Sequence, residues 1–469
     1  MRRRMVFPWL AVLAALLFCV PTAWADAALP ASLQAKIDKI ANDALKQSGV
    51  PSASIAVVQD GKLAYLHAYG DARLHPKTAA TPAMRYSIGS ISKQFTAAAI
   101  LILQQQGKLS LDDKVAKYFP ELTDADHITI RQILSHTSGY QDYWPQDYLM
   151  PPMKAPTAPE AIMDKWAKIP LDFAPGSQWQ YSNTNYVIAG SIVKKLTGET
   201  PFEFLEKNVF TPLGVSNEYD TNLHALPATD ARGYSRCALG PLHPSEKEGV
   251  DWMFGAGELA LTARDLAKWD IAMIDEILLK PASWKEMETE VVLNNGLGSN
   301  YGLGVFVGRM GSHRMIAHDG EVMGFTAGNY VFPDDHAAVV VLTNQDAVDT
   351  FRTIGMGIAK ALFNVQDPAA TKALAQAKTI FADLQHGKID RSLLTADANS
   401  YFDATAMHDY QTSLAPLGKP KSFEIHGARK RGGMQMRGYL VTFPKQKLAV
   451  TTYILPDGKI EQYIVAPAN

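Results

Sequence analysis

The chain has 469 residues, of which 47% are hydrophobic, so it can form one large domain with an extensive core. Its formal net charge is −2, which excludes the strong basic excess typical of nucleic-acid-binding proteins. A His-Glu-x-x-His pair and a cysteine–histidine cluster are both absent from the sequence, so we predict no metal site and no cofactor.

The first 25 residues have the three parts of a bacterial export signal. Arginines at positions 2–4 precede an apolar run over residues 9–20, and Ala23-Trp24-Ala25 supplies small residues for cleavage. The apolar run is too short for a comfortable membrane span. We therefore expect residues 1–25 to be removed, leaving an exported protein, periplasmic or secreted, without a stable membrane anchor. Cys237 would then be the remaining cysteine, so no intrachain disulfide is expected.

Periodicity predicts helix and strand in the next part of the chain. Residues 32–47 have the pattern of an amphipathic helix, and residues 55–65 that of a β-hairpin around Asp60-Gly61. A mostly helical region follows, and strand patterns return near residues 302–343.

The segment Ser90-Ile91-Ser92-Lys93 is the first candidate for catalysis. Residues 94–104 are apolar and rich in helix formers, which predicts a buried helix beginning near Ser90. On that helix Lys93 lies one turn from Ser90, where burial would lower its pKa and make it a proton acceptor for the serine. A second Ser-x-x-Lys, at Ser191 and Lys194, lies inside a predicted helix, and we assign it a structural role.

A long aromatic loop follows, over residues 140–148, with a proline-rich continuation over residues 151–159. Loops of this length are commonly lids or binding loops. Tyr143 and Trp144, with Tyr148, are therefore candidates to line an apolar substrate pocket. The alternative is that they pack the loop onto the domain.

Two further motifs lie downstream. Tyr181-Ser182-Asn183 follows a turn-forming segment and precedes a helix pattern. Tyr181 can relay a proton if a cation is close, and the Asn183 amide can hold both a lysine and a substrate carbonyl. His318-Asp319-Gly320 lies in a strand–turn–strand pattern.

After Phe363 the character of the chain changes. A helix is predicted to start at Pro368 and another to span residues 404–414, followed by strand-like runs near 422–425, 439–443, 448–454 and 462–465. This segment resembles the helix-then-curved-sheet appendages of cystatin-like or NTF2-like proteins, and it carries no nucleophile motif. We expect it to pack against the enzyme or contribute to the rim of the substrate site.

The three motifs, in this order, resemble those of the serine β-lactamase and penicillin-binding-protein superfamily, especially its class C-like esterases and D-amino-acid peptidases. The resemblance includes residues 86–96, 133–139, 179–186 and 255–257. It implies a β-lactamase-like α/β fold, in which helices flank an antiparallel sheet beside an all-α subdomain. The expected domains are residues 26–365 for this fold and 366–469 for a small C-terminal α+β domain.

The resemblance also implies roles for individual residues. Ser90, Lys93 and Tyr181 would be catalytic, and Asn183, His318 and Gly320 would bind substrate. The backbone N–H groups of Ser90 and of a residue near Glu321 would form the oxyanion hole.

The chain departs from the Lys-Thr-Gly version of the third motif, because His318 takes the place of the lysine. Histidine is mostly neutral at pH 7, which argues against strong recognition of substrates that carry a carboxylate. His136 raises a rival Ser–His arrangement, but the family stretch around it is structural and Gly-x-Ser-x-Gly is absent from the sequence.

The sequence thus predicts an exported serine hydrolase that cleaves an ester or amide through a Ser90 acyl-enzyme. Its expected partner is a small-molecule, peptide or ester substrate. One alternative is a D-amino-acid peptidase or carboxypeptidase, or a weak β-lactamase, acting on cell-wall material. A second is a catalytically silent binding or sensor protein that keeps the fold.

Overall fold

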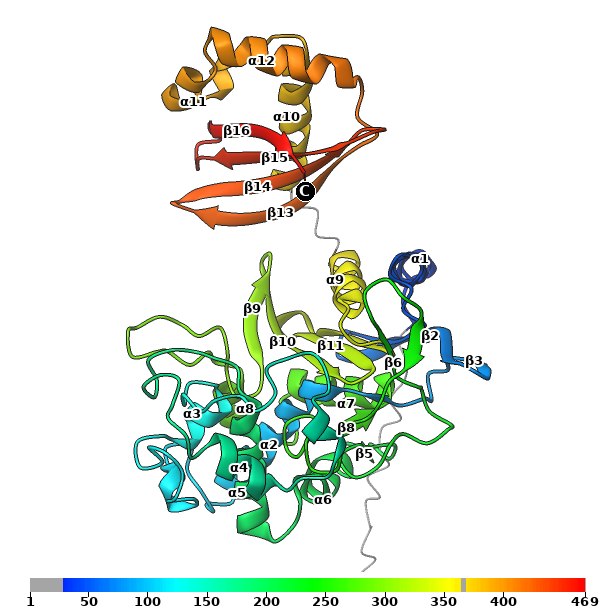
Figure 1. Ribbon diagram of the computed structural model, residues 1–469, viewed down its shortest axis with the longest axis vertical. Helices are drawn as coiled ribbons and strands as arrows, with labels where there is room; N and C mark the ends of the chain where they lie inside the picture. The colour runs from blue at the N-terminus through cyan, green and yellow to red at the C-terminus, as the bar shows by residue number, and fades with distance from the viewer. Residues whose placement is uncertain (1–27, 364–367, 469) are drawn as a thin grey trace, which may run out of the picture. The chain divides into compact units, whose positions relative to one another are not determined.

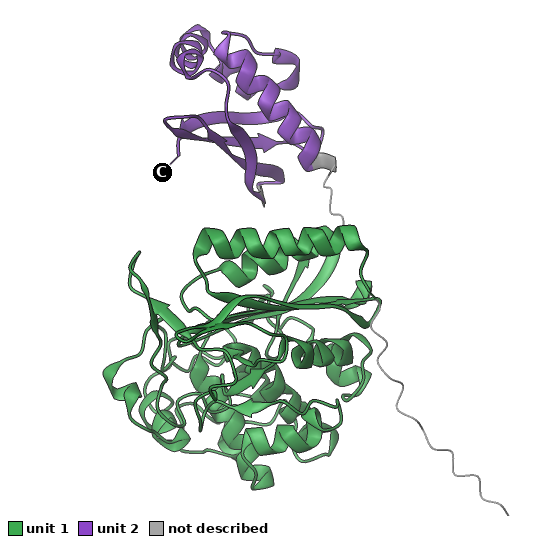
Figure 2. Ribbon diagram, turned by 90° about the vertical axis from the view of Figure 1, so that its right-hand side faces the viewer, with its two compact units in different colours: residues 1–363 green, residues 364–469 purple. Residues whose placement is uncertain are grey.

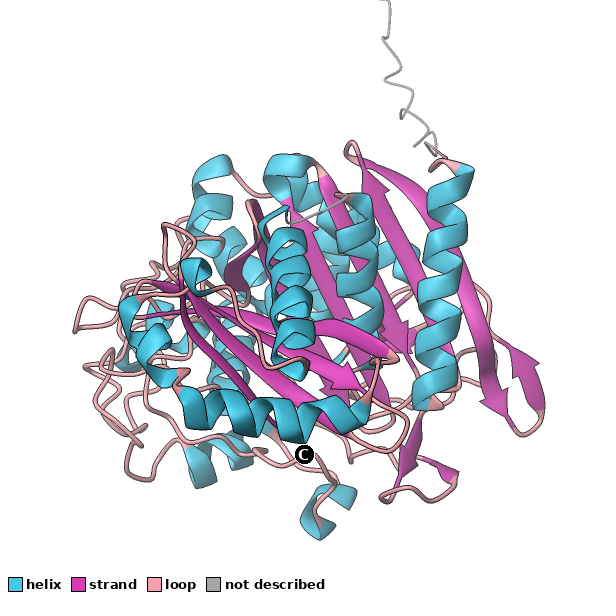
Figure 3. Ribbon diagram, turned by 90° about the horizontal axis from the view of Figure 1, so that it is seen from above, coloured by secondary structure: helices cyan, strands magenta, loops and turns pink. Residues whose placement is uncertain are grey.

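The computed structural model describes residues 28–363 and 368–468. The chain divides into two compact units, residues 1–363 and 364–469 (Figure 2). Each unit has its own sheet and helices. Figure 3 distinguishes the helices from the strands by colour. The export signal predicted for residues 1–25 lies outside the described residues. Within the described ranges, no helix is both long and apolar enough to cross a membrane.

The first unit is built on an antiparallel sheet of seven strands, in the order β3-β2-β1-β12-β11-β10-β9. Strands from the two ends of the unit meet in its middle, where β1 pairs with β12. The strands are β1 (Ser52–Gln59), β2 (Lys62–Leu74), β3 (Lys77–Ala79), β9 (Phe306–Met310), β10 (His313–Val322), β11 (Phe325–Phe332) and β12 (Ala337–Thr343).

The β1–β2 turn shows why the predicted hairpin forms where it does. Asp60 and Gly61 both have positive φ, at 52° and 70°. Two consecutive residues of this kind make the turn whose twist matches that of the flanking strands, and glycine and aspartate tolerate it well.

Helices cover both faces of this sheet. The helices α1 and α9 lie together on one face, and the remaining helices lie on the other (Figure 1). A hydrophobic core lies on each face of the sheet, and alternate residues of β1 belong to different cores. Ile55 and Val57 lie in the core with α1 and α9, whereas Ala56 and Val58 lie in the core with the remaining helices. The helices are α1 (Ala31–Ser48), α2 (Ser92–Gln105), α3 (Ile130–Leu134), α4 (Pro159–Trp166), α5 (Asn183–Thr197), α6 (Pro201–Leu205), α7 (Ala263–Ile274), α8 (Pro281–Met287) and α9 (Thr350–Leu362).

Short strands complete the first unit close to the three motifs. The central strand of a three-stranded sheet, β8, pairs with β4 and β5, and a separate hairpin is formed by β6 and β7. These strands are β4 (Tyr86–Ser87), β5 (Tyr219–Asp220), β6 (Tyr234–Arg236), β7 (Leu242–Pro244) and β8 (Leu259–Leu261). The predicted α/β class, with an antiparallel sheet, flanking helices and a helical region, is confirmed.

The second unit places helices before a four-stranded antiparallel sheet in sequential order. Its core includes Phe381 and Leu384 from α10, together with Tyr439 and Val450 from the sheet. The elements are α10 (Pro368–Gln385), α11 (Ala396–Tyr401), α12 (Ala404–Leu414), β13 (Ser422–Arg431), β14 (Met434–Thr442), β15 (Lys447–Ile454) and β16 (Ile460–Pro467). The predicted succession of helices and then strands is therefore present.

Candidate active site

Ser90 lies in a single 3₁₀ turn, Gly89–Ile91, that leads directly into α2. The helix is buried on most of its surface, and most of its side chains are apolar or small. Ser90 itself is half-buried, at the start of this rigid element. A hydroxyl held in this way can react with a substrate without first paying for the ordering of a loop.

Two glycines allow the serine turn to approach β10 backbone to backbone. A Cβ on Gly89 would lie 2.8 Å from the amide nitrogen of Glu321, and one on Gly320 would lie 1.9 Å from the carbonyl oxygen of Ile88. No larger residue fits at either position without a backbone shift. The approach brings the chain next to Ser90 against the backbone of Glu321, where an oxyanion hole was predicted.

Lys93 is fully buried, and its ammonium nitrogen makes three hydrogen bonds. Nζ donates to Ser90 Oγ at 2.9 Å, to Asn183 Oδ1 at 2.8 Å and to the carbonyl oxygen of Ala256 at 2.8 Å. Burial lowers the pKa of Lys93 to about 7, although the nearby Asp142 acts in the opposite direction. A substantial fraction of Lys93 is therefore neutral near pH 7 and able to accept a proton.

Asn183 links Lys93 to a carboxylate that the sequence analysis missed. Asp142 accepts the backbone N–H of Asn183 at 2.9 Å, and its two carboxylate oxygens lie 3.2 and 3.3 Å from Asn183 Nδ2. The carboxylate thus caps the N-terminus of α5 and fixes the Asn183 amide so that Oδ1 faces Lys93. Burial raises the pKa of Asp142, and its hydrogen bonds with Asn183 partly offset that rise.

Tyr181 lies over Lys93, whose Nζ is 4.9 Å from the centre of the phenol ring. Its hydroxyl is buried and has no hydrogen-bond partner at bonding distance in the described structure. Burial raises the pKa of Tyr181, and the adjacent Ser90 hydroxyl offsets only part of that rise. Tyr181 is consequently a protonated phenol beside a weakly basic lysine, and the two groups can exchange a proton in the roles of acid and base.

His318 lies in the core, behind Ser90, Lys93 and Tyr181, and does not line the cavity that opens over Ser90. It is 1% exposed, its Nδ1 is 2.6 Å from the Asp319 carbonyl oxygen, and its Nε2 is 2.9 Å from the Tyr301 hydroxyl. Burial, followed by the charge of Lys93, lowers the pKa of His318 to about 3. The ring is therefore neutral, as predicted, but its two nitrogens are occupied, so the structure does not present it to a substrate.

A cavity of about 430 Å³ opens over Ser90. Tyr143 and Trp144 both line it, whereas His318 and Gly320 do not. Tyr143 is 1% exposed and its hydroxyl donates to the carbonyl oxygen of Trp252, so this ring also belongs to the core. Both alternatives considered for the aromatic loop thus hold for Tyr143. The lining residues are Ser90, Asp142, Tyr143, Trp144, Pro145, Gln146, Asp147, Gln180, Tyr181, Asn183, Met253, Glu321, Val322, Met323 and Asp346.

This cavity is strongly acidic. Its described lining contains four carboxylates, those of Asp142, Asp147, Glu321 and Asp346, and neither an arginine nor a lysine. Burial raises the pKa of Glu321, and the charges of Asp147 and Asp346 add to that rise. A cationic group placed here would relieve the repulsion between the carboxylates, whereas an anionic group would increase it.

His136 and Ser191 do not join the catalytic group. His136 is fully buried, and its Nδ1 accepts the backbone N–H of Ser182 at 3.2 Å. Its ring lies 4.3 Å from that of Tyr181, centre to centre, and therefore supports the phenol from behind. Ser191 is buried within α5, and its hydroxyl has no hydrogen-bond partner among the described residues.

Comparisons with known proteins identify the family of the chain. The family described as Beta-lactamase matches residues 37–362. Penicillin-binding protein 4* of Bacillus subtilis is 26% identical over 309 residues, which cover 63% of this chain and 68% of that protein. The D-aminopeptidase of Brucella anthropi is 26% identical over 323 residues, covering 66% of this chain and 60% of the relative. These matches thus leave about a third or more of each relative unaccounted for.

Solved structures share the fold of the first unit. The D-amino acid amidase from Ochrobactrum anthropi, solved with D-phenylalanine, superposes with a TM-score of 0.63 at 25% identity. The superposition covers 72% of this chain and all of the amidase chain. A class C β-lactamase in complex with cefoxitin has a TM-score of 0.58 at 22% identity, over 70% of this chain and 99% of that one, which supports the fold alone.

Proposed function

Because the chain belongs to the β-lactamase family of serine hydrolases, we propose that it cleaves an amide or ester bond through an acyl-enzyme on Ser90. The observation that carries this proposal is the 2.9 Å hydrogen bond between Ser90 Oγ and the Nζ of a lysine whose pKa is about 7. A serine needs a base of this kind to become nucleophilic at neutral pH.

In the proposed mechanism neutral Lys93 accepts the Ser90 proton while Oγ attacks the carbonyl carbon. The backbone N–H groups of Ser90 and Glu321 stabilise the oxyanion. The bond to the leaving group then breaks, with Tyr181 donating the proton that the leaving atom needs and recovering one from Lys93. A water molecule then attacks the acyl-enzyme carbonyl while Lys93 takes its proton. The bond between the acyl carbon and Ser90 Oγ breaks, and Lys93 returns the proton to Oγ, which restores the Ser90 hydroxyl.

The acidic cavity supports a substrate whose acyl part carries an ammonium group. The carboxylates of Asp147, Glu321 and Asp346 would stabilise such a group near the reacting carbonyl. Two relatives are named for activity on D-amino-acid compounds, an aminopeptidase and an amidase. We therefore propose amides or esters of amino acids with a free amine, including D-amino acids, as the substrate class.

The same cavity argues against the β-lactamase alternative. A β-lactam presents a carboxylate, and the described lining offers no cationic side chain to bind it. His318, at the position of the family lysine, is buried and neutral. We expect β-lactams to be poor substrates at neutral pH.

Covalent labelling tests the proposal directly. A fluorophosphonate should label the native protein and the Ser191→Ala variant, and peptide mapping should locate the label on Ser90. The Ser90→Ala variant should fold with an unchanged circular dichroism spectrum and remain unlabelled. A label on Ser191 contradicts the assignment of Ser90 as the nucleophile. A native protein that resists labelling altogether contradicts the acyl-enzyme and favours the silent binding protein.

A substrate panel tests the proposed class. It compares kcat/KM for D- and L-aminoacyl nitroanilides, their N-acetylated forms, a nitrophenyl ester and a chromogenic cephalosporin. Substrates with a free amine should have a higher kcat/KM than their N-acetylated forms, because acetylation removes the positive charge that the cavity attracts. A large preference for the cephalosporin would restore the β-lactamase alternative.

Export is part of the same proposal. The sequence of residues 1–25 supports a cleaved signal, and N-terminal sequencing of protein recovered from the periplasm or medium tests it. An N-terminus at Asp26 is expected.

A further inference from the structure

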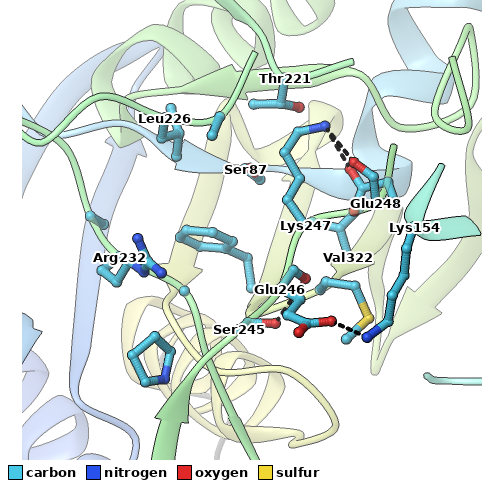
Figure 4. A pocket seen from close by; sticks show the side chains of 16 residues that line it. Ser87, Lys154, Thr221, Leu226, Arg232, Ser245, Glu246, Lys247, Glu248 and Val322 are labelled. Carbon is cyan, nitrogen blue, oxygen red and sulfur yellow. Dashed lines mark hydrogen bonds and ion pairs between the residues drawn. The ribbon is translucent and has the colours of Figure 1, made fainter. Parts of the chain in front are cut away.

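A second cavity, of about 530 Å³, adjoins the catalytic one (Figure 4). The two cavities share Val322, the last residue of β10, and Met323, which begins the turn between β10 and β11. A substrate bound at Ser90 can therefore extend over this turn from one cavity into the other.

The part of the substrate that reaches the second cavity is the acyl part. Tyr181 and Asn183 line the catalytic cavity but not the second one. A leaving group that takes its proton from Tyr181 must lie close to that residue. The acyl group then points away from it, past Glu321 and along the turn.

The wall of the second cavity combines apolar surface with charged side chains. Leu226, Val322 and Phe325 provide apolar contacts. Lys154 forms an ion pair with Glu246 at 2.5 Å, and Lys247 forms one with Glu248 at 3.4 Å, as Figure 4 shows on one side of the cavity.

Arg232, on the opposite side in Figure 4, is the remaining cation of the wall. Its exposed guanidinium has no hydrogen-bond or ion-pair partner within the described part of the chain. Each of the cavity's two glutamates is paired with a lysine, so Arg232 leaves one positive charge uncompensated.

The backbone holds Arg232 firmly beside the turn. Its N–H donates to the carbonyl oxygen of Ala72 at 2.9 Å, and its own carbonyl oxygen accepts from Asn344 Nδ2 at 3.1 Å. The next residue, Gly233, lies so close to the turn that an added Cβ would be 2.7 Å from the ring of Phe325. Arg232 is thus attached at a fixed point of the cavity wall while its charge remains free.

We propose that the second cavity binds the distal end of an acyl group that terminates in a carboxylate, with Arg232 as the partner of that carboxylate. This inference rests on the proposed acyl-enzyme function. The methylene groups of the acyl chain would pack on Leu226, Val322 and Phe325, and the guanidinium would bind the carboxylate through charge-assisted hydrogen bonds. Together the cavities would take an α-amino acyl group with its ammonium near Glu321 and its carboxylate at Arg232.

Matched pairs of aminoacyl nitroanilides test this inference. Each pair has side chains of equal length that end in a carboxylate or in the isosteric carboxamide, beginning with glutamyl and glutaminyl and lengthening by one methylene at a time. At the length that reaches Arg232, the native protein should favour the carboxylate about tenfold in kcat/KM. The preference should fall as salt is added, because the guanidinium is exposed.

Three variants separate the site from general charge effects. Arg232→Leu should give equal kcat/KM values for the carboxylate and carboxamide members of a pair. Arg232→Glu should make the carboxamide the better substrate. Arg264→Leu, which removes an exposed arginine outside either cavity lining, should keep the native preference.

The possible outcomes distinguish the inference from the function on which it rests. Carboxamide turnover without a carboxylate preference at any length overturns the second site and leaves the proposed function intact. So does a preference that survives Arg232→Leu. If no member of the series is turned over and Ser90 is not labelled, both the second site and the proposed function are overturned.

Discussion

The Asp142→Asn substitution should shift the pH dependence of the reaction toward acid. Asp142 raises the pKa of Lys93, to which it is linked through the Asn183 amide. Asparagine keeps an oxygen that accepts the Asn183 N–H groups but removes the negative charge. The variant should therefore retain the geometry of the site while the pKa of Lys93 falls below its native value.

The size of this effect depends on the distance between the two charges. Lys93 Nζ lies 2.8 Å from Asn183 Oδ1, and Asn183 Nδ2 lies 3.2 Å from Asp142 Oδ1, so the two charges are separated by the width of one amide group and two hydrogen bonds. At about 8 Å and an effective dielectric constant of about 20 to 40, they interact by about 1 to 2 kcal/mol, or about one pKa unit.

In the proposed mechanism catalysis needs neutral Lys93, so kcat/KM should fall as the pH drops through the pKa of Lys93. That pKa is about 7 in the native protein. If this pKa falls by about one unit, the neutral fraction of Lys93 at pH 6 rises from about 9% to about 50%. Relative to the plateau at high pH, kcat/KM at pH 6 should therefore rise roughly fivefold.

The assay is kcat/KM between pH 5 and 9 with a neutral ester, whose own charge does not change in this range. Asp164→Asn provides a control that removes one exposed carboxylate outside the catalytic cavity and should leave the profile unchanged. Asp142→Ala, which also removes the hydrogen-bond acceptor, should lower the plateau. A profile of Asp142→Asn that is uniformly depressed without a shift, or shifted toward alkali, would refute this account of Lys93.

Two further predictions concern the same elements. Lys93→Met and Tyr181→Phe should each lower kcat strongly, and the double variant should lose much less than the product of the two losses, because in the proposed mechanism the two groups handle the same proton. The measurement is kcat of the native protein and the three variants with one ester, and a strictly multiplicative loss would indicate independent roles. Gly320→Ala should destabilise the fold by about 1 to 3 kcal/mol and lower activity, since its Cβ would meet the Ile88 carbonyl oxygen at 1.9 Å. Gly308→Ala, on the neighbouring strand with nothing within 4 Å, should be almost neutral in the same urea titration.

The features that could be predicted from the sequence are those in which neighbours along the chain cooperate. The three-residue spacing of Ser90 and Lys93 places both on one turn of the helical segment, whatever surrounds that segment. The positive φ angles of Asp60 and Gly61 fix the first hairpin locally. The order of the three motifs indicated the family, and the uninterrupted apolar run 337–342 forms most of β12, as its pattern suggests.

Only the tertiary structure decided which distant groups meet. Asp142 and Asn183 are 41 residues apart. Local pattern alone does not predict that the Asp142 carboxylate caps the helix α5, which begins at Asn183. His318 lies on the strand where a substrate-binding residue was expected, but its contacts with Tyr301 and the Asp319 carbonyl oxygen turn it into the core. Strand periodicity indicates that successive side chains alternate between faces, whereas long-range packing determines what each face meets. For the same reason, the acidic lining of the catalytic cavity arises from segments near 142, 147, 321 and 346 that only the fold brings together.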